Sequence, residues 1–213
     1  MGRIQKGILG GFSGKVGTVV GATWRGIEIM RSRPKRSSRP PTDQQAEQRE
    51  RFAFVAHFLR PVRSLLRMYF GQPSGAKSRS NLATSYHMTE TVTGTYPNFA
   101  IDYPKVIVSK GELLGLQDAT VSTIGGGEIK CNWTDNTGQG QAVATDAVFV
   151  AVYNESKQLW ETKRAIATRV DSVFNLNLAD TWVGDTVHCW VGVVKADDKL
   201  CSNSEYFGPV VLT

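Results

Sequence analysis

Residues 146–168, DAVFVAVYNESKQLWETKRAIAT, decide the fold class of the C-terminal half of the chain. An apolar run at 146–153 and a second β-rich run at 158–168 flank the polar break NESK at 154–157. β-Branched and aromatic residues favour strands, and a short polar break between two such runs is typical of a turn. The stretch therefore predicts a β-hairpin.

The same pattern repeats on both sides of this hairpin. Polar breaks at 135–138 and 196–199 separate further β-rich runs, which lie at 105–109, 116–123, 127–133, 172–178, 186–195 and 206–212. Seven or eight short strands at these intervals predict an all-β, immunoglobulin-like sandwich domain over 105–213. The comparison is with the architecture alone, because Trp133 follows Cys131 too closely for the usual Cys…Trp…Cys spacing.

The N-terminal part of the chain has a different composition. Valines and isoleucines within 7–32 favour extended structure, but frequent glycines interrupt it. We expect an irregular hairpin or extended arm that packs on something else, since a two-stranded ribbon alone is marginally stable. The next stretch, RSRPKRSSRPP at 31–41, combines basic residues with prolines and predicts an extended, solvated linker. Residues 1–41 thus form a predicted arm and linker.

Helical periodicity follows the linker. Thr42 or Asp43 resembles an N-cap, and Glu47 follows it, which predicts a helix from about 43 to 59. Because Pro61 removes a backbone donor, we expect a kink or a second helix over 61–70. One apolar stripe runs along both segments and predicts core packing; its members are Phe52, Val55, Leu59, Val62, Leu66 and Tyr69.

A third, shorter helix is expected over 81–92, and turn signals with two Tyr-Pro pairs predict an irregular segment at 93–105. Residues 42–104 therefore form a helical and irregular connecting region. The predicted fold class is α+β, with a basic N-terminal arm and a helical segment followed by the all-β sandwich.

The net charge of +6 hides an asymmetry along the chain. Residues 1–80 hold 16 Lys/Arg against 4 Asp/Glu, whereas residues 81–213 hold 9 against 15. On one continuous helix, four arginines of the helical region would fall within an arc of about 60°. A basic surface attracts phosphate backbones or acidic protein surfaces. The candidate contact residues are Arg25, Arg31, Arg33, Lys35, Arg36, Arg39, Arg49, Arg60, Arg63 and Arg67.

The sequence contains no motif that indicates catalysis. The stretch LGGFSGKV at 9–16 lacks the first Gly and the final Ser or Thr of a phosphate-binding P-loop. The histidines, His57, His87 and His188, form no compact metal-ligand pattern. Cys189 adjoins His188 on a predicted strand, where neighbouring side chains point to opposite faces. We therefore expect no enzyme activity, no cofactor and no metal site.

Compartment signals are few. The cysteines at 131, 189 and 201 suggest neither a dense disulfide framework nor a zinc ribbon, so reduced thiols and a Cys131–Cys189 bridge both stay open. The basic start of the chain is not followed by the long apolar region of a signal peptide. No run of about 18 apolar residues predicts a transmembrane helix. We expect a location in the cytoplasm or within a particle.

Three phrases resemble an uncharacterised bacterial family of about this length. They are GKVGTVVGATWRGIEIMRSRP at 14–34, TDQQAEQRERF at 42–52 and SNLATSYHMTETVTGTYPNFAIDYPKVIVSKGEL at 80–113. The resemblance spans most of the chain. This family is a domain of unknown function, so it implies no catalytic residues.

Two functional hypotheses remain. The first is a non-enzymatic structural or assembly protein, a component of a phage-like or other repetitive particle, whose basic arm contacts neighbouring subunits in a homo-oligomer or larger assembly. The second is a nucleic-acid-binding module that contacts phosphates without sequence preference. The assembly hypothesis ranks first because the arm has no evident core of its own and because the two parts of the chain carry opposite charges.

Overall fold

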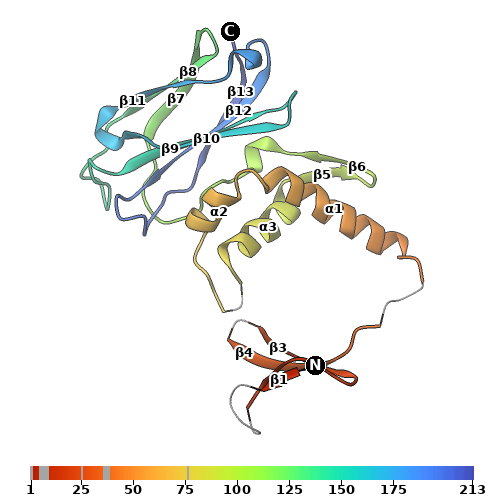
Figure 1. Cartoon of the computed structure of the whole chain (residues 1–213). Coiled ribbons are helices and arrows are strands. Elements are labelled where there is room, and N and C mark those ends of the chain that lie inside the picture. The colour runs from red at the N-terminus through yellow and green to blue at the C-terminus, as the bar shows by residue number, and fades with distance from the viewer. Residues whose placement is uncertain (1, 5–9, 25, 36–38, 76) are drawn as a thin grey trace. The chain divides into compact units, whose positions relative to one another are not determined.

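The computed structural model describes residues 2–4, 10–24, 26–35, 39–75 and 77–213 (Figure 1). The chain forms two compact units, Met1–Gln44 and Gln45–Thr213. Within these described ranges, most of the regular structure is β-sheet, accompanied by three α-helices. The smaller unit contains one sheet, and the larger unit contains the helices and the other sheets.

The smaller unit is a four-stranded antiparallel sheet in which each strand pairs with the next: β1 (Gly2–Ile4), β2 (Phe12–Val16), β3 (Val19–Trp24) and β4 (Ile27–Ser32). This corrects the expected irregular hairpin or arm, because the glycines fit the sheet instead of breaking it. Gly17 adopts a φ of +57° between β2 and β3. A Cβ at Gly21 would lie 2.0 Å from the carbonyl oxygen of Phe12, so glycine allows β2 and β3 to approach.

The helices are α1 (Asp43–Leu59), α2 (Arg63–Tyr69) and α3 (Arg79–Glu90). The prediction of α1 is confirmed, as is the break at Pro61, after which the chain starts a second helix. The helix α3 begins two residues before its predicted start because the hydroxyl of Ser78 accepts a hydrogen bond from the Asn81 N–H at 3.3 Å.

Two expectations for the stretch after α3 are wrong. Residues 93–105 are not wholly irregular, since β5 (Val92–Thr95) and β6 (Asn98–Ile101) form a hairpin, followed by a 3-10 turn, η1 (Tyr103–Lys105). Residues 105–109 are not a strand. Val106 and Val108 are buried, but the Val108 N–H donates to the Ser204 hydroxyl at 2.9 Å. The apolar alternation there reflects burial without strand pairing.

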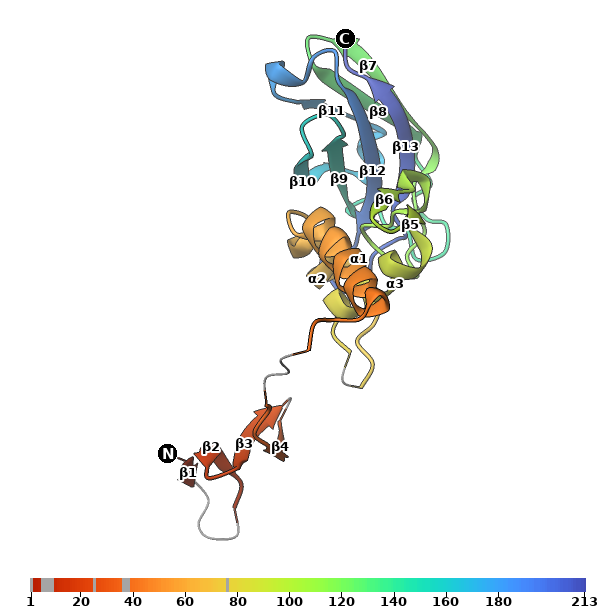
Figure 2. The same cartoon turned by 90° about the vertical axis from the view of Figure 1, so that its right-hand side faces the viewer.

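The remaining strands form two sheets that face each other as a seven-stranded β-sandwich (Figure 2). One has the order β11-β8-β7, and the other has the order β10-β9-β12-β13. The predicted strands other than 105–109 are confirmed, with bounds β7 (Gln117–Gly125), β8 (Glu128–Thr134), β9 (Ala147–Asn154), β10 (Leu159–Thr168), β11 (Val173–Asn177), β12 (Thr186–Val194) and β13 (Glu205–Val211).

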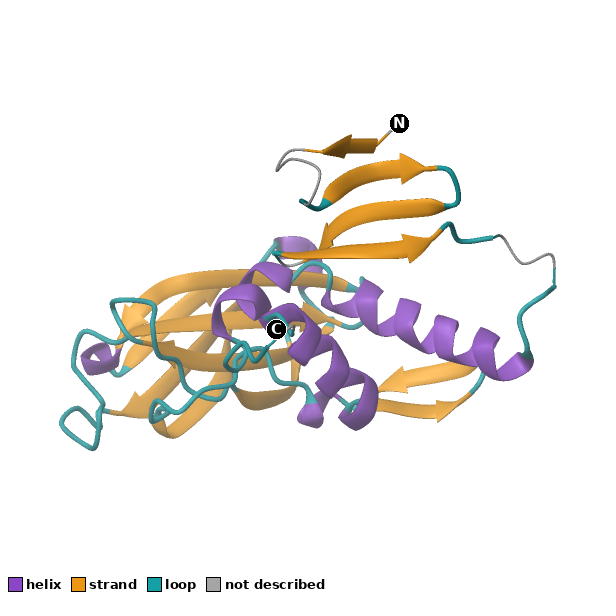
Figure 3. Ribbon diagram, turned by 90° about the horizontal axis from the view of Figure 1, so that it is seen from below, coloured by secondary structure: helices purple, strands orange, loops and turns teal. Residues whose placement is uncertain are grey.

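The sheet β10-β9-β12-β13 is covered on both faces. One face packs on the other sheet through Val150 and Cys189, which share a core with Trp133 and Phe174. The opposite face shares a second core with the helices; its buried members include Phe58, Leu66, Tyr69, Phe149 and Trp190. The helices accordingly gather beside the sandwich, together with the β5–β6 hairpin (Figure 3). Burial on both faces explains why β9 and β12 are nearly continuous apolar runs.

A buried arginine, Arg169, joins separate segments at one end of the sandwich through hydrogen bonds. The side chains of Arg169 and Asp146 are fully buried, and Arg169 Nε donates to Asp146 Oδ2 at 3.1 Å. The guanidinium also donates to the carbonyl oxygens of Leu114 and Gly115 and to the side-chain oxygen of Asn136. One side chain therefore holds the segment before β7 and the loop after β8.

We expect Arg169→Met to lower the free energy of unfolding by about 3–5 kcal/mol, because it leaves the Asp146 carboxylate buried without its counter-charge. Urea denaturation measures the change. The control is Arg164→Met, which removes an exposed ion pair with Asp198 and should cost less than about 1 kcal/mol. Equal losses in the two variants would contradict the role given to Arg169.

Candidate functional site

The predicted contact residues of the smaller unit lie on its surface. Arg31 is on β4, and Arg33, Lys35 and Arg39 follow it without regular secondary structure; all four are exposed. Arg25 and Arg36 lie outside the described residues. Residues 1–44 hold nine Lys/Arg against two Asp/Glu. Arg31, Arg33 and Lys35 are therefore accessible to a phosphate or an acidic partner.

The sheet of this unit exposes large apolar side chains. Val16 is 55% exposed, Trp24 51%, Ile27 60% and Met30 70%. Gly21 is the one fully buried residue among those whose burial is described in β1 to β4. In register, Trp24 pairs with Ile27 and Met30 pairs with Gly21, so apolar side chains lie on both faces of the sheet. Exposed apolar surface of this kind is typical of an interaction site.

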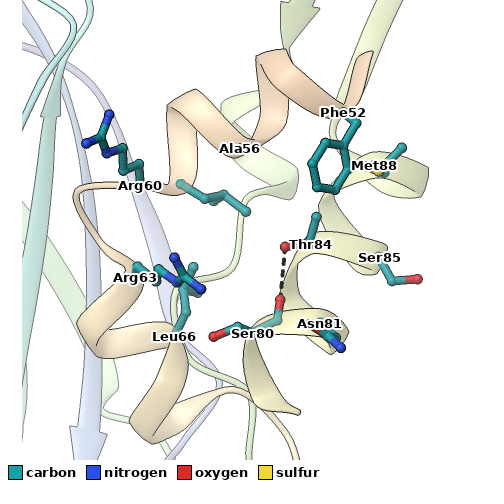
Figure 4. Close-up of a pocket in the computed structure, with 11 residues that line it drawn as sticks. Phe52, Ala56, Arg60, Arg63, Leu66, Ser80, Asn81, Thr84, Ser85 and Met88 are labelled. Atoms are coloured by element: carbon teal, nitrogen blue, oxygen red, sulfur yellow. Dashed lines mark hydrogen bonds between the residues drawn. The ribbon is translucent and has the colours of Figure 1, made fainter. Parts of the chain in front are cut away.

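The four predicted arginines of the helical region do not form one edge. Because the helix is interrupted between α1 and α2, a helical wheel drawn for one continuous helix does not apply. Arg60 and Arg63 line one groove of about 650 Å³, whereas Arg49 and Arg67 are exposed and do not line it. We call this the arginine groove; it is lined by Phe52, Ala56, Leu59, Arg60, Arg63, Leu66, Ser80, Asn81, Thr84, Ser85 and Met88 (Figure 4).

The arginine groove combines an apolar surface with polar walls. Phe52 was predicted to pack in the core, but its ring is 53% exposed and faces the groove, which corrects that expectation (Figure 4). On α3, the Thr84 hydroxyl donates to the carbonyl oxygen of Ser80 at 2.9 Å. Among the residues that the structure describes, no acidic side chain lines the groove. The groove therefore suits an apolar group that carries negative charge.

A second groove, of about 580 Å³, was not predicted at all. We call it the aromatic groove; its lining includes Phe54, Phe58, Phe99, Tyr103, Tyr153, Glu155, Leu159 and Trp160, with His57 and Arg60 also present. Phe58 lies edge-on to Tyr153 and to Trp160, with ring centroids 5.1 Å apart in each pair. Such packing gives a rigid wall of aromatic faces and edges.

Glu155 supplies the acidic group of the aromatic groove. Its side chain is 53% exposed, and the only ion-pair partner within 4 Å among the described residues is His188 Nε2, at 3.5 Å. Burial lowers the pKa of His188 below its usual 6.5, although Glu155 opposes the shift. At neutral pH the imidazole is therefore uncharged and leaves the negative charge of Glu155 without a compensating cation.

Tyrosines hold His188 in place. The His188 ring stacks on Tyr103 with centroids 3.8 Å apart, and His188 Nδ1 lies 2.8 Å from the Tyr206 hydroxyl. Burial raises the pKa of Tyr103, and the nearby Glu155 raises it further. Both tyrosines are thus neutral hydrogen-bonding groups at physiological pH. The arrangement can bind a cation between a carboxylate and aromatic faces.

The cysteines of the chain are buried, and no metal-binding cluster accompanies them among the described residues. No group of three or more His, Cys, Asp or Glu among them could hold a metal ion. Cys131, Cys189 and Cys201 are buried free thiols, and burial raises the pKa of Cys131 and of Cys189 to about 12. Cys189 packs inside the sandwich, whereas His188 faces η1. In the part of the chain that the structure describes, no helix is long and apolar enough to cross a membrane.

We expect the free energy of unfolding to fall as the pH drops below 6.5, in part because His188 binds a proton more readily in the unfolded chain than in the folded one. His188→Gln should therefore show a shallower fall than the parent chain between pH 6.5 and about pH 5.5. Urea denaturation at each pH measures the slope. The exposed His57→Gln is the control; a slope for His188→Gln that matches the parent would contradict the assignment.

The chain was compared with curated proteins, solved structures and family models. No curated protein matches the chain. The chain resembles the solution structures of fn3 domains from the human collagen alpha-1(XX) chain, at 11% identity and TM-score 0.36, and from human contactin 1, at 10% and 0.31. These matches cover 49% of this chain and 90% and 83% of the respective domains. A family model covers residues 11–208, so this chain belongs to DUF6266, a family of unknown function.

Proposed function

We propose that this chain is a non-enzymatic structural or assembly protein, whose basic N-terminal unit binds neighbouring copies in a homo-oligomer or a larger, phage-like particle. The observation that carries the proposal is the N-terminal sheet. It exposes Val16, Trp24, Ile27 and Met30 and has no buried apolar side chain of its own among those described. A small sheet without a core is marginally stable in water, and a partner's surface would supply the missing burial.

The distribution of charge supports contacts between unlike parts of two copies. Residues 1–80 carry a net charge of +12, and residues 81–213 carry −6. Opposite charges on the two parts favour a head-to-tail arrangement, because like parts repel and unlike parts attract. In this proposal, residues 1–41 reach the neighbour, residues 42–104 connect, and the immunoglobulin-like sandwich at 105–213 forms the rigid body of an α+β protein.

The alternative is a nucleic-acid-binding module, which the exposed basic side chains after β4 favour. Arg31, Arg33 and Lys35 could each neutralise a phosphate without reading a base. The two functions differ in their response to salt. Phosphate binding weakens steeply as salt rises, whereas an interface with an apolar core resists salt.

We expect the purified, nuclease-treated chain to form an oligomer that persists at high salt, and Met30→Asp to weaken its self-association about tenfold, because a charge replaces apolar surface that a neighbour covers. Sedimentation equilibrium at low and high salt gives the dissociation constant. The matched control is Ile124→Asp, which places the same charge at a 49% exposed position on β7. This control should change the dissociation constant less than twofold.

Three outcomes would contradict assembly through the N-terminal sheet. A chain that stays monomeric at every concentration would rule out assembly through its own copies. A monomer that carries nucleic acid until salt removes it, detected by its absorbance ratio, would instead support phosphate binding. Equal effects of Met30→Asp and Ile124→Asp on the dissociation constant would show that the N-terminal sheet does not mediate assembly.

A further inference from the structure

We propose that the aromatic groove of one copy binds the proline- and arginine-rich segment of a second copy, through residues 33–35 and 39–41. This inference rests on the proposed assembly function and names the receiving site. The segment belongs to the basic unit, and the groove contains an uncompensated carboxylate. The match is therefore one of charge and of shape.

The groove has the chemistry of a cation site. The ring centroids of Tyr153 and Trp160 lie 5.0 Å apart, and those of Tyr103 and Tyr153 lie 5.7 Å apart. The three rings therefore line one continuous surface. A guanidinium or ammonium group placed on an aromatic face is attracted by the ring's negative potential, and Arg does this most often. Glu155 adds a full negative charge at the same surface.

The Tyr103 hydroxyl interacts with the Glu155 carboxylate but brings no compensating positive charge. The Trp160 indole N–H donates to the carbonyl oxygen of Phe58 at 3.1 Å, so it does not compete for Glu155. His188 is neutral at physiological pH and supplies no positive charge. Arg60 and His57, which also line the groove, lie at the end of α1, whereas Glu155 follows β9. An incoming cation should therefore bind on the side of the β9–β10 hairpin.

The segment has the conformation that such grooves recognise. Pro34 and Pro40 fix their own φ angles and push Arg33 and Arg39 toward extended geometry. Both described stretches lack helix and strand structure and are exposed. Pro-rich segments of this kind bind aromatic-lined grooves because their extended conformation is already formed, which reduces the entropy lost on binding. Prolines can pack on the rings while a neighbouring cation reaches the carboxylate.

The first experiment compares the dissociation constants of full-length variants by sedimentation equilibrium. We expect Glu155→Gln to raise the dissociation constant about tenfold, and Arg33→Gln combined with Lys35→Gln to raise it by a similar factor. The control is Glu161→Gln, on the same hairpin but outside the groove, which should change it less than twofold. Trp160→Leu tests the aromatic wall independently, and circular dichroism verifies that each variant is folded.

The second experiment asks whether the contact joins two chains. One tagged chain carries Lys35→Cys, and an untagged chain carries Leu159→Cys, at a 53% exposed position of the groove. Because the native cysteines are buried, a short bismaleimide should link the two new thiols into a mixed dimer. Glu155→Gln in the second chain should reduce the yield severalfold. Efficient linking only within a chain that carries both substitutions would overturn binding by a second copy.

The two proposals fail in distinguishable ways. A chain that does not self-associate refutes the assembly function and this inference with it. A chain that self-associates, responds to Met30→Asp, and yet tolerates Glu155→Gln without forming the mixed dimer retains the assembly function and refutes the aromatic groove as the receiving site.

Discussion

The sheet β10-β9-β12-β13 must bury both of its faces, and the rest of the larger unit follows from this constraint. Val150 and Cys189 face the other sheet, while Phe149 and Trp190 face the opposite way. Neither set can remain in water without a large loss of hydrophobic stabilisation. The helices are therefore part of the same compact body, and both grooves form where they and the β5–β6 hairpin meet one another or the sheet.

Much of the fold could be predicted because local patterns coincide with tertiary demands. The bounds of α1 followed from a cap and an apolar stripe, and the strands of the sandwich from β-branched runs between polar turns. The failures have two causes. The sheet β1 to β4 and the β5–β6 hairpin contain glycine and proline that single-sequence rules treat as breakers, and residues 105–109 alternate without a strand to pair with.

The candidate sites could be predicted only in part. Exposure of the basic residues follows from their chemistry, and the proximity of Arg60 and Arg63 follows from their spacing of three residues. The exposed ring of Phe52 is one member of the apolar stripe that the core does not cover, which no helical wheel reveals. The aromatic groove joins α1, β6, η1, β9 and β10. No spacing rule brings such separate segments together, and Glu155 by itself resembles an ordinary turn residue.

Under the proposed assembly function, the four-stranded N-terminal sheet would make the stability of the protein depend on its own abundance. If neighbours supply its burial, a newly made copy carries an incomplete unit until enough other copies accumulate, and during that interval its backbone is open to proteases. Scarce chains would be degraded and plentiful ones preserved, so the amount of mature protein would rise more steeply than its rate of synthesis. The feature would thus act as a concentration threshold, set by the stability of one small sheet.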